Sequence, residues 1–388
     1  MNDTVEQAGQ LAQQAMAALR QGDAGNARAL FQQAGTVNDQ DASIWLGLGF
    51  ACAQLDDSPA TLAAVDKALA LEPYNMRALL FKGDHLAHEQ QSRKALVYYK
   101  AALKLASRQS SIPPDVQTAL RRAEASIEKA AGEYEEYLLQ HLQKAGYSPA
   151  QSHPRFVQAL DIAFGKADIY YQQPTRFYYP GLPQIQFYPR QQFPWLEQLE
   201  ANTEAIRVEL DGVMQQADRF TPYLQSNPDI VNFNDVTNLD NDDWGAFYFY
   251  QAGREVRENA ALCPATMQAL SGAPLPLVEG STPHALFSKL AGNTRIPPHC
   301  GLINTRLICH LPLLVPKDCG GLRVGNQTQY WQEGEAYIFD DSIEHEAWND
   351  SDRERVVLLF DIWRPELDEE ERHLISAMLQ SVQSFEDG

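Results

Sequence analysis

Cysteine is scarce in this chain, and its spacing shows no pairing pattern. Five cysteines occur in 388 residues, and no two of them are spaced as in a Cys-x-x-Cys motif. An odd number without such pairs favours neither a disulfide framework nor a thiolate zinc site. A reducing environment fits this usage best, so we expect the protein to be cytoplasmic.

Long apolar runs are also missing. The first six residues, Met1-Asn2-Asp3-Thr4-Val5-Glu6, have no basic segment followed by an apolar one, and no uninterrupted apolar stretch is long enough to cross a bilayer. We therefore expect neither secretion nor membrane insertion.

Positive charge is the third shortage. The sequence has 31 Lys and Arg against 51 Asp and Glu, a formal net charge of -20, which would repel a phosphate backbone over most of the surface. Nucleic acid is not an expected partner. The remaining composition, 44% hydrophobic and 21% charged over 388 residues, is typical of a soluble globular chain with two domains.

The first hundred residues contain a repeat of 34 residues. Three positions recur with this spacing and are small, bulky and small in turn: Ala27, Thr61 and Ala95; Phe31, Val65 and Tyr99; Ala34, Ala68 and Ala102. Two closely packed antiparallel helices need this pattern where their backbones approach. The middle copy resembles the tetratricopeptide pattern through Trp45, Leu48, Gly49, Ala68 and Pro73. A non-repetitive helical bundle is the alternative, because the flanking copies have leucine, Leu11 and Leu79, in place of the tryptophan.

Two changes of composition divide the rest of the chain. A Ser-Ile-Pro-Pro-Asp break at 111–115 precedes a helical stretch to about Lys144, which would cap the last repeat. From Tyr170 to Trp195 the chain is crowded with Tyr, Phe, Pro and Gln, which indicates an extended lead-in whose aromatic side chains pack against a neighbouring domain. We predict repeats over 1–105, a helical cap and linker over 106–165, and a second domain over 166–388.

Short β-rich runs between Gly, Pro, Asn and Asp turns fill residues 285–363, which indicates a sandwich or jelly roll, and a surface helix is expected over 366–385. In the run 305–313, an alternation of period two places Arg306, Ile308 and His310 on one face.

A second strand is predicted over 355–363. The same alternation places Arg355, Val357, Leu359 and Asp361 on one of its faces.

Two histidines at strand or turn edges are candidate metal ligands. His299 follows Ile-Pro-Pro, and His345 follows Phe-Asp-Asp-Ser-Ile-Glu. Imidazole is a good iron ligand, and a non-haem iron(II) oxygenase keeps its protein ligands on one side so that co-substrate and oxygen occupy the other positions. Arg355, ten residues beyond His345, could form a fork-like pair with a carboxylate of the co-substrate. A salt bridge from Arg355 to Asp361 or Asp341 is the structural alternative.

These residues belong to a longer pattern, which runs in the order His299-Cys300-Gly301, Asn304-Thr305-Arg306-Leu307, His310-Leu311, Leu322-Arg323-Val324-Gly325, Trp331-Gln332-Glu333-Gly334, Phe339-Asp340-Asp341-Ser342, His345-Glu346 and Asp361-Ile362-Trp363-Arg364-Pro365-Glu366-Leu367. In order and spacing it resembles the aspartyl/asparaginyl β-hydroxylases. A weaker resemblance reaches back through Asp243-Trp244-Gly245 and Gly253-Arg254 to Phe193-Pro194-Trp195, so it covers about half of the chain.

The resemblance implies a multidomain α and β protein, with an N-terminal α-solenoid followed by a double-stranded β-helix (jelly-roll) domain with flanking helices. It also implies ligands: iron(II) on His299 and His345, and 2-oxoglutarate on Ser288, His310 and Arg355.

The third ligand position departs from most related oxygenases. They add a carboxylate two positions after the first histidine, where this chain has Gly301. The resembled family uses two protein ligands, with water in the remaining place. Asp340 or Asp341 is an alternative source of a carboxylate, although we expect both to organise the turn before His345.

The implied activity is hydroxylation of a C–H bond with O2, giving succinate and CO2 as co-products. The expected target is the β-carbon of an Asp/Asn-type residue in a peptide or protein. Arg306 would bind a substrate carboxylate, although Ile308 stands where the animal enzymes have a second arginine. The repeats would recruit the protein substrate, and a small acidic substrate is an alternative. A tetratricopeptide scaffold with a non-catalytic jelly roll, and a jelly-roll metalloenzyme of another reaction type, are the competing interpretations.

Overall fold

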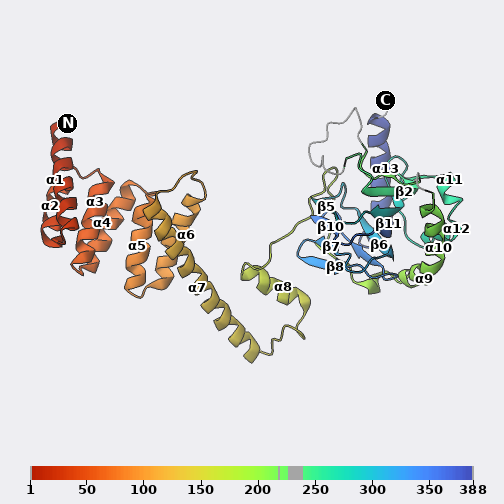
Figure 1. Ribbon diagram of the computed structural model, residues 1–388, viewed down its shortest axis with the longest axis horizontal. Helices are drawn as coiled ribbons and strands as arrows, with labels where there is room; N and C mark the ends of the chain where they lie inside the picture. The colour runs from red at the N-terminus through yellow and green to blue at the C-terminus, as the bar shows by residue number, and fades with distance from the viewer. Residues whose placement is uncertain (1, 217–218, 226–238, 387–388) are drawn as a thin grey trace. The chain divides into compact units, whose positions relative to one another are not determined.

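The computed structural model describes residues 2–216, 219–225 and 239–386, in two compact units, Met1–Val157 and Gln158–Gly388 (Figure 1). We call them the helical unit and the sheet unit. The domain boundaries predicted at 105 and 165 stay predictions. Among the described helices, none is both long and apolar enough to span a membrane.

Three helical hairpins form most of the helical unit. Their helices are α1 (Asn2–Arg20) with α2 (Ala24–Val37), α3 (Ala42–Gln54) with α4 (Ser58–Leu71), and α5 (Met76–His88) with α6 (Ser92–Ala106) (Figure 1). Short polar residues cap the N-termini of α2 to α5: the side chains of Asp23, Asp41, Asp57 and Asn75 each accept a hydrogen bond from a backbone N–H of the first turn.

The 34-residue pattern coincides with the hairpin contacts. All nine recurring residues between Ala27 and Ala102 are buried. Gly83 shows how close the paired helices come, because a Cβ there would lie 2.4 Å from a ring carbon of Tyr99. The predicted packing of small residues against bulky ones is therefore confirmed.

A long helix, α7 (Pro114–Lys144), follows the last hairpin. Its first turns bury Val116, Leu120 and Ala123 in one cluster with Leu79 and Tyr99, so it covers the apolar face that the last hairpin would otherwise expose. A shorter helix, α8, spans Pro154–Ala163.

The sheet unit contains two antiparallel sheets. The larger has the order β1-β2-β4-β11-β6-β9, with β3 also paired to β2, and the smaller has the order β5-β10-β7-β8. Their strands are β1 (Thr221–Pro222), β2 (Trp244–Gln251), β3 (Arg254–Glu255), β4 (Ala285–Leu290), β5 (Thr294–His299), β6 (Arg306–Leu314), β7 (Gly321–Val324), β8 (Gln327–Tyr330), β9 (Tyr337–Phe339), β10 (His345–Asn349) and β11 (Arg355–Trp363). The first three lie before the region in which the sequence predicts strands.

Helices complete the sheet unit. They are a 3-10 turn at Arg190–Gln192, then α9 (Leu196–Ala201), α10 (Thr203–Met214), α11 (Arg257–Ala260), α12 (Pro264–Leu270) and α13 (Glu369–Glu386) (Figure 1). The terminal helix agrees with the surface helix predicted over 366–385.

The two central strands of the larger sheet have the predicted faces. Leu307 of β6 and Leu358 of β11 pack in one apolar core with Leu210 of α10, whereas Ile308 and Val357 pack on the opposite face with residues of the smaller sheet. Period-two alternation thus directs Arg306, His310, Arg355 and Asp361 toward the space between the sheets.

The aromatic lead-in segment is held against the sheets by a buried ion pair. Arg364 and Asp340 are both 0% exposed, with Nη1 of Arg364 2.9 Å from Oδ2 of Asp340. Arg364 also donates to the carbonyl of Pro183, and Asp340 accepts from the side chain of Gln172, so both partners bind the segment. The backbone pairs Gln172 with Ile343 as well.

We predict that Arg364→Met lowers the free energy of unfolding of the sheet unit by roughly 3–5 kcal/mol, because it leaves the Asp340 carboxylate buried without its countercharge. Denaturant unfolding of the full chain measures this. Arg254→Met is the matched control: its partner is Glu279 and both side chains are more than half exposed, so the loss should be below about 1 kcal/mol. Equal losses in the two variants would contradict the prediction.

Candidate functional site

Two imidazoles face one another where β5 pairs with β10. The antiparallel register sets His299 opposite His345, and their ring centres are 4.1 Å apart. Nδ1 of His299 lies 2.8 Å from the carbonyl oxygen of Pro297, and Nδ1 of His345 lies 3.0 Å from that of Ile343. A carbonyl only accepts, so each Nδ1 carries the proton and each Nε2 is the nitrogen with a lone pair suited to a metal.

The buried member of this pair, His345, is held in the neutral form that binds metals. Burial and, after it, the neighbouring His299 lower the pKa of His345 to about 3, so its imidazole is neutral near pH 7. Within residues 2–216, 219–225 and 239–386, no group of three or more His, Cys, Asp and Glu side chains could hold a metal ion. The two-histidine ligand set stays a prediction.

Packing leaves no room for a side chain at Gly301, the position where most related oxygenases have a carboxylate ligand. A Cβ on Gly301 would lie 2.1 Å from Oδ2 of Asp341, and the Gly301 N–H donates to the Asp341 carbonyl at 2.7 Å. Asp340 organises the turn as expected, since its Oδ1 accepts from both the backbone N–H and the hydroxyl of Ser342. Asp341 is therefore the carboxylate that packs against Gly301, two residues from His299.

A second group of buried polar side chains surrounds an aromatic ring. Arg355, at the start of β11, has its guanidinium carbon 4.5 Å from the ring centre of Trp331, and the imidazole of His310 stacks on the same indole at 5.7 Å. Nη1 of Arg355 donates to the carbonyl of Ser288 on β4 at 3.4 Å, and the Ser288 hydroxyl accepts from Nε1 of Trp244 at 3.3 Å. The structure thus brings the three predicted co-substrate residues together.

Three buried nitrogens in this group lack partners. Nε of Arg355 and Nε1 of Trp331 are donors, and Nε2 of His310 donates or accepts according to its tautomer; none of the three has a hydrogen bond to any described residue. Burial lowers the pKa of Arg355 to about 10, and burial followed by the charge of Arg355 lowers the pKa of His310 well below its ordinary value. Because buried polar groups in folded proteins nearly always have partners, this arrangement fits an anionic ligand.

The histidine pair and the group formed by Arg355, His310 and Trp331 both lie next to the ring of Phe339. The ring of Phe339 lies 5.6 Å from that of His345 and 5.0 Å from that of His310. The histidine pair and the group around Trp331 therefore lie on either side of one aromatic ring.

The salt bridge considered for Arg355 is not formed, since Asp341 and Asp361 both pair with Arg306 instead. Nη2 of Arg306 lies 3.0 Å from Oδ2 of Asp341, and Nη1 donates to Oδ1 of Asp361. The reason is distance along the strand: Arg355 and Asp361 share a face but lie six residues apart, about 20 Å in extended backbone. The register of β11 against β6 sets Trp363 opposite Arg306 and so brings Asp361 beside it.

The two carboxylates that Arg306 contacts are shifted in opposite directions. Burial raises the pKa of Asp341 to about 7, although Arg306 opposes the rise. Burial also acts on Asp361, but Arg306 and hydrogen bonds from His284 outweigh it and hold that pKa at about 2. Asp361 accepts from the Thr282 hydroxyl at 2.7 Å and from the His284 N–H at 2.8 Å, which explains the difference.

Sequence reasoning gave no role to Trp331 or Trp244. Both lie in motifs that carry the family resemblance, but their contacts with Arg355, His310 and Ser288 join segments that are distant in the chain. Only a rule that a buried cation seeks an aromatic face could have pointed to Trp331.

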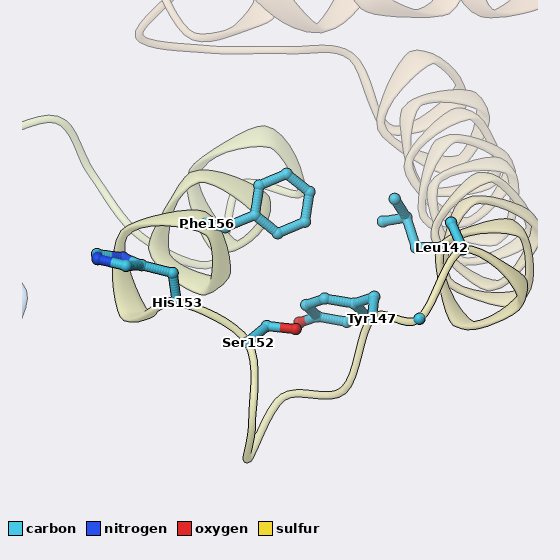
Figure 2. A pocket seen from close by; sticks show the side chains of 7 residues that line it. Leu142, Tyr147, Ser152, His153 and Phe156 are labelled. Carbon is cyan, nitrogen blue, oxygen red and sulfur yellow. The ribbon is translucent and has the colours of Figure 1, made fainter.

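A separate pocket lies in the helical unit, between the end of α7 and the start of α8. Figure 2 shows Tyr147 and Phe156 on its walls, with His153 and Ser152 at its edge. Its lining is mainly apolar and has no paired acid, base or metal ligand, so we assign no chemistry to it.

Residues 200–365 match the model of the family described as aspartyl/asparaginyl beta-hydroxylase. The family resemblance is thereby shown for this segment. A Rhizobium tropici protein, "Ornithine lipid ester-linked acyl 2-hydroxylase", is 36% identical over 175 residues, which cover 45% of this chain and 58% of that protein. The human "Aspartyl/asparaginyl beta-hydroxylase" is 32% identical over 185 residues, 47% of this chain and 23% of that protein. The chain thus spans little more than half of the first relative and under a quarter of the second.

Five of the six predicted site residues, all but Arg306, lie in the two polar groups described above, and all six lie within the matched segment. Among solved structures, the "Arabidopsis OM64 TPR domain" covers 31% of this chain and 96% of its own length at 18% identity, with a TM-score of 0.27. A score that low supports no conclusion, and the hairpins themselves are the evidence for the repeats.

The depressed pKa of Asp361 predicts a pH-dependent contribution to stability. Its folded pKa of about 2 lies below the ordinary 3.8, so the ionised form stabilises the fold by about 2 kcal/mol above pH 4, and this is lost as the pH falls through about 2. Unfolding free energies of the native chain and Asp361→Asn should differ most near neutral pH and converge in acid. A difference that does not change with pH would rule out this assignment.

Proposed function

We propose that the sheet unit is an iron(II)- and 2-oxoglutarate-dependent dioxygenase that hydroxylates a C–H bond. One observation carries the proposal: an anchored histidine pair lies beside buried donors without partners. The family match supports hydroxylation, and the donor group supports an anionic co-substrate. We also propose that the two sheets form a double-stranded β-helix and that the protein is cytoplasmic.

The side chains present fit both groups. His299 and His345 would hold iron(II) through Nε2. Arg355 would bind the far carboxylate of 2-oxoglutarate, with Ser288 and His310 as further contacts. Together, iron(II) and 2-oxoglutarate would supply the oxidising chemistry, in which one oxygen atom of O2 enters succinate as 2-oxoglutarate loses CO2 and the other enters the C–H bond of the substrate.

The chain's own residues orient the side chains of the site and exclude water from it. The carbonyls of Pro297 and Ile343 fix the ring planes of the two histidines. The indole of Trp331 fixes the guanidinium plane of Arg355, and the surrounding apolar residues of both sheets keep water away from the polar groups. Orientation and electrostatics are the protein's contribution, because the metal and co-substrate supply the difficult chemistry.

The proposed substrate is an Asp/Asn-type residue of a peptide or protein, hydroxylated at its β-carbon. The human relative's name supports this target, and the helical unit offers a repeat surface of the kind that binds extended peptides. The name of the Rhizobium relative favours a second candidate, an acyl chain of a lipid. A scaffold with a non-catalytic jelly-roll binding domain would account for the buried donors but not for the histidine pair anchored beside them.

Replacing a metal ligand tests the assignment directly. We predict that His299→Ala and His345→Ala each abolish the weak visible band that the iron(II) chelate of 2-oxoglutarate gives under anaerobic conditions, since two protein ligands leave little redundancy. Titration of iron-loaded protein with 2-oxoglutarate measures the band. His373→Ala, in an exposed position on α13, should leave it unchanged. If a site variant retains the full band, its histidine is not a ligand.

Arg355 can be tested through the co-substrate. We expect Arg355→Ala to raise the 2-oxoglutarate concentration needed for half-maximal chelate formation by about tenfold to a hundredfold, because a bidentate charged contact contributes roughly 1.5–3 kcal/mol.

Arg355→Lys is the matched variant. It keeps the charge but loses the fork, so its requirement should lie between those of the native chain and Arg355→Ala. An unchanged requirement in Arg355→Ala would exclude Arg355 as the carboxylate contact.

A further inference from the structure

Trp331 contacts two of the side chains that the proposed function assigns to 2-oxoglutarate. The guanidinium carbon of Arg355 is 4.5 Å from its ring centre, and the imidazole of His310 stacks on the same indole with 24° between the ring planes. The indole is 6% exposed and packs with Ile308 and Phe339 in the apolar cluster between the sheets. Trp331 is therefore part of the same enclosed group, although it follows β8 at the edge of the smaller sheet.

These contacts use the faces of the indole and leave its N–H available. A cation and a stacked ring both bind the π face, whereas the Nε1–H bond lies in the ring plane and points outward from the edge. Nε1 is buried and has no hydrogen-bond partner among the described residues. A buried donor without a partner costs about 1–3 kcal/mol, so an acceptor supplied by a ligand would be strongly favoured here.

The unsatisfied nitrogens of this group call for one shared acceptor. Nε of Arg355 is a second buried donor without a described partner, next to the indole that carries the first. A carboxylate has two oxygens with about four acceptor positions, enough to accept from a guanidinium and an indole N–H together. The positive charge over the ring also polarises the indole, which strengthens its N–H as a donor to an anion.

We propose that Trp331 is a further binding residue for 2-oxoglutarate. Its indole N–H donates to the far carboxylate, while the face of its ring holds the guanidinium of Arg355 against the same group. The inference rests on the proposed function, because the acceptor belongs to the co-substrate. It makes Trp331 a determinant of which 2-oxo acid binds, since only an acid with a second carboxylate offers the acceptor.

Two 2-oxo acids separate this role from a structural one. 2-Oxopentanoate has the carbon chain and the metal-chelating end of 2-oxoglutarate but lacks the far carboxylate. Each acid is titrated anaerobically into the full-length, iron-loaded protein, and the chelate band is recorded. Trp331→Phe keeps an aromatic face and removes the N–H. We expect it to raise the 2-oxoglutarate concentration needed for half-maximal chelate formation about tenfold, and that of 2-oxopentanoate by less than about twofold.

Trp195→Phe is the matched control. Its ring packs 6.0 Å from that of Phe360, in the core on the other face of the larger sheet, so both titrations should match those of the native chain. Equal losses for the two acids in Trp331→Phe, or no loss for either, overturn the proposal.

A second measurement observes the hydrogen bond itself. The sequence has six tryptophans, so protein labelled with nitrogen-15 tryptophan and loaded with zinc(II) gives six indole N–H signals. The signal of Trp331 is the one that persists when each of the other tryptophans is replaced in turn. It should move downfield when 2-oxoglutarate is added. An unmoved signal overturns the proposal even if Trp331→Phe does not fold or 2-oxopentanoate binds too weakly to titrate.

The titration of the native chain with 2-oxoglutarate, recorded first, separates the two levels of inference. If the native chain gives no chelate band, the proposed function fails and the role of Trp331 fails with it. If the band is present, a negative result at Trp331 overturns only the inference about this residue.

In that case the oxygenase assignment and the role of Arg355 stand.

Discussion

A positive charge can be buried only if an anion meets it, and this constraint organises the sheet unit. Arg364 forms an ion pair with Asp340 that holds the lead-in segment in place. Arg306 of β6 forms ion pairs with Asp341, in the turn before β10, and with Asp361 of β11. Arg355 is as deeply buried as Arg364 but has no carboxylate partner among the described residues. Two guanidinium groups thus have carboxylate partners within the protein, and the third is arranged to bind the anion of a ligand.

The register of the sheets places the unpaired Arg355 near the two histidines. Pairing of β5 with β10 sets one histidine opposite the other, and pairing of β11 with β4 and β6 sets Arg355 and His310 on the face that looks toward them. The polar groups are fixed by backbone hydrogen bonds and by large aromatic rings. Such preorganisation is what would allow a few side chains to hold the proposed metal and dicarboxylate in a constant relation.

Local patterns were sufficient to predict much of this arrangement. The 34-residue spacing located the buried face of each hairpin, and period-two alternation located the faces of β6 and β11, because both depend only on near neighbours in the chain. The partners in the ion pairs were harder to predict from the sequence. Asp341 and Asp361 lie 35 and 55 residues from Arg306, and only the strand register decides which arginine they meet. The role of Trp331 was hidden for the same reason.

The alternation of β6 also limits how this site can change. Leu307, Cys309 and Leu311 fill the core on one face of that strand, while Arg306 and His310 serve the other. Deleting or inserting one residue would exchange the faces, sending charge into the core and apolar side chains toward the histidine pair. This strand therefore tolerates replacement of single side chains such as Ile308 far better than any change of its length.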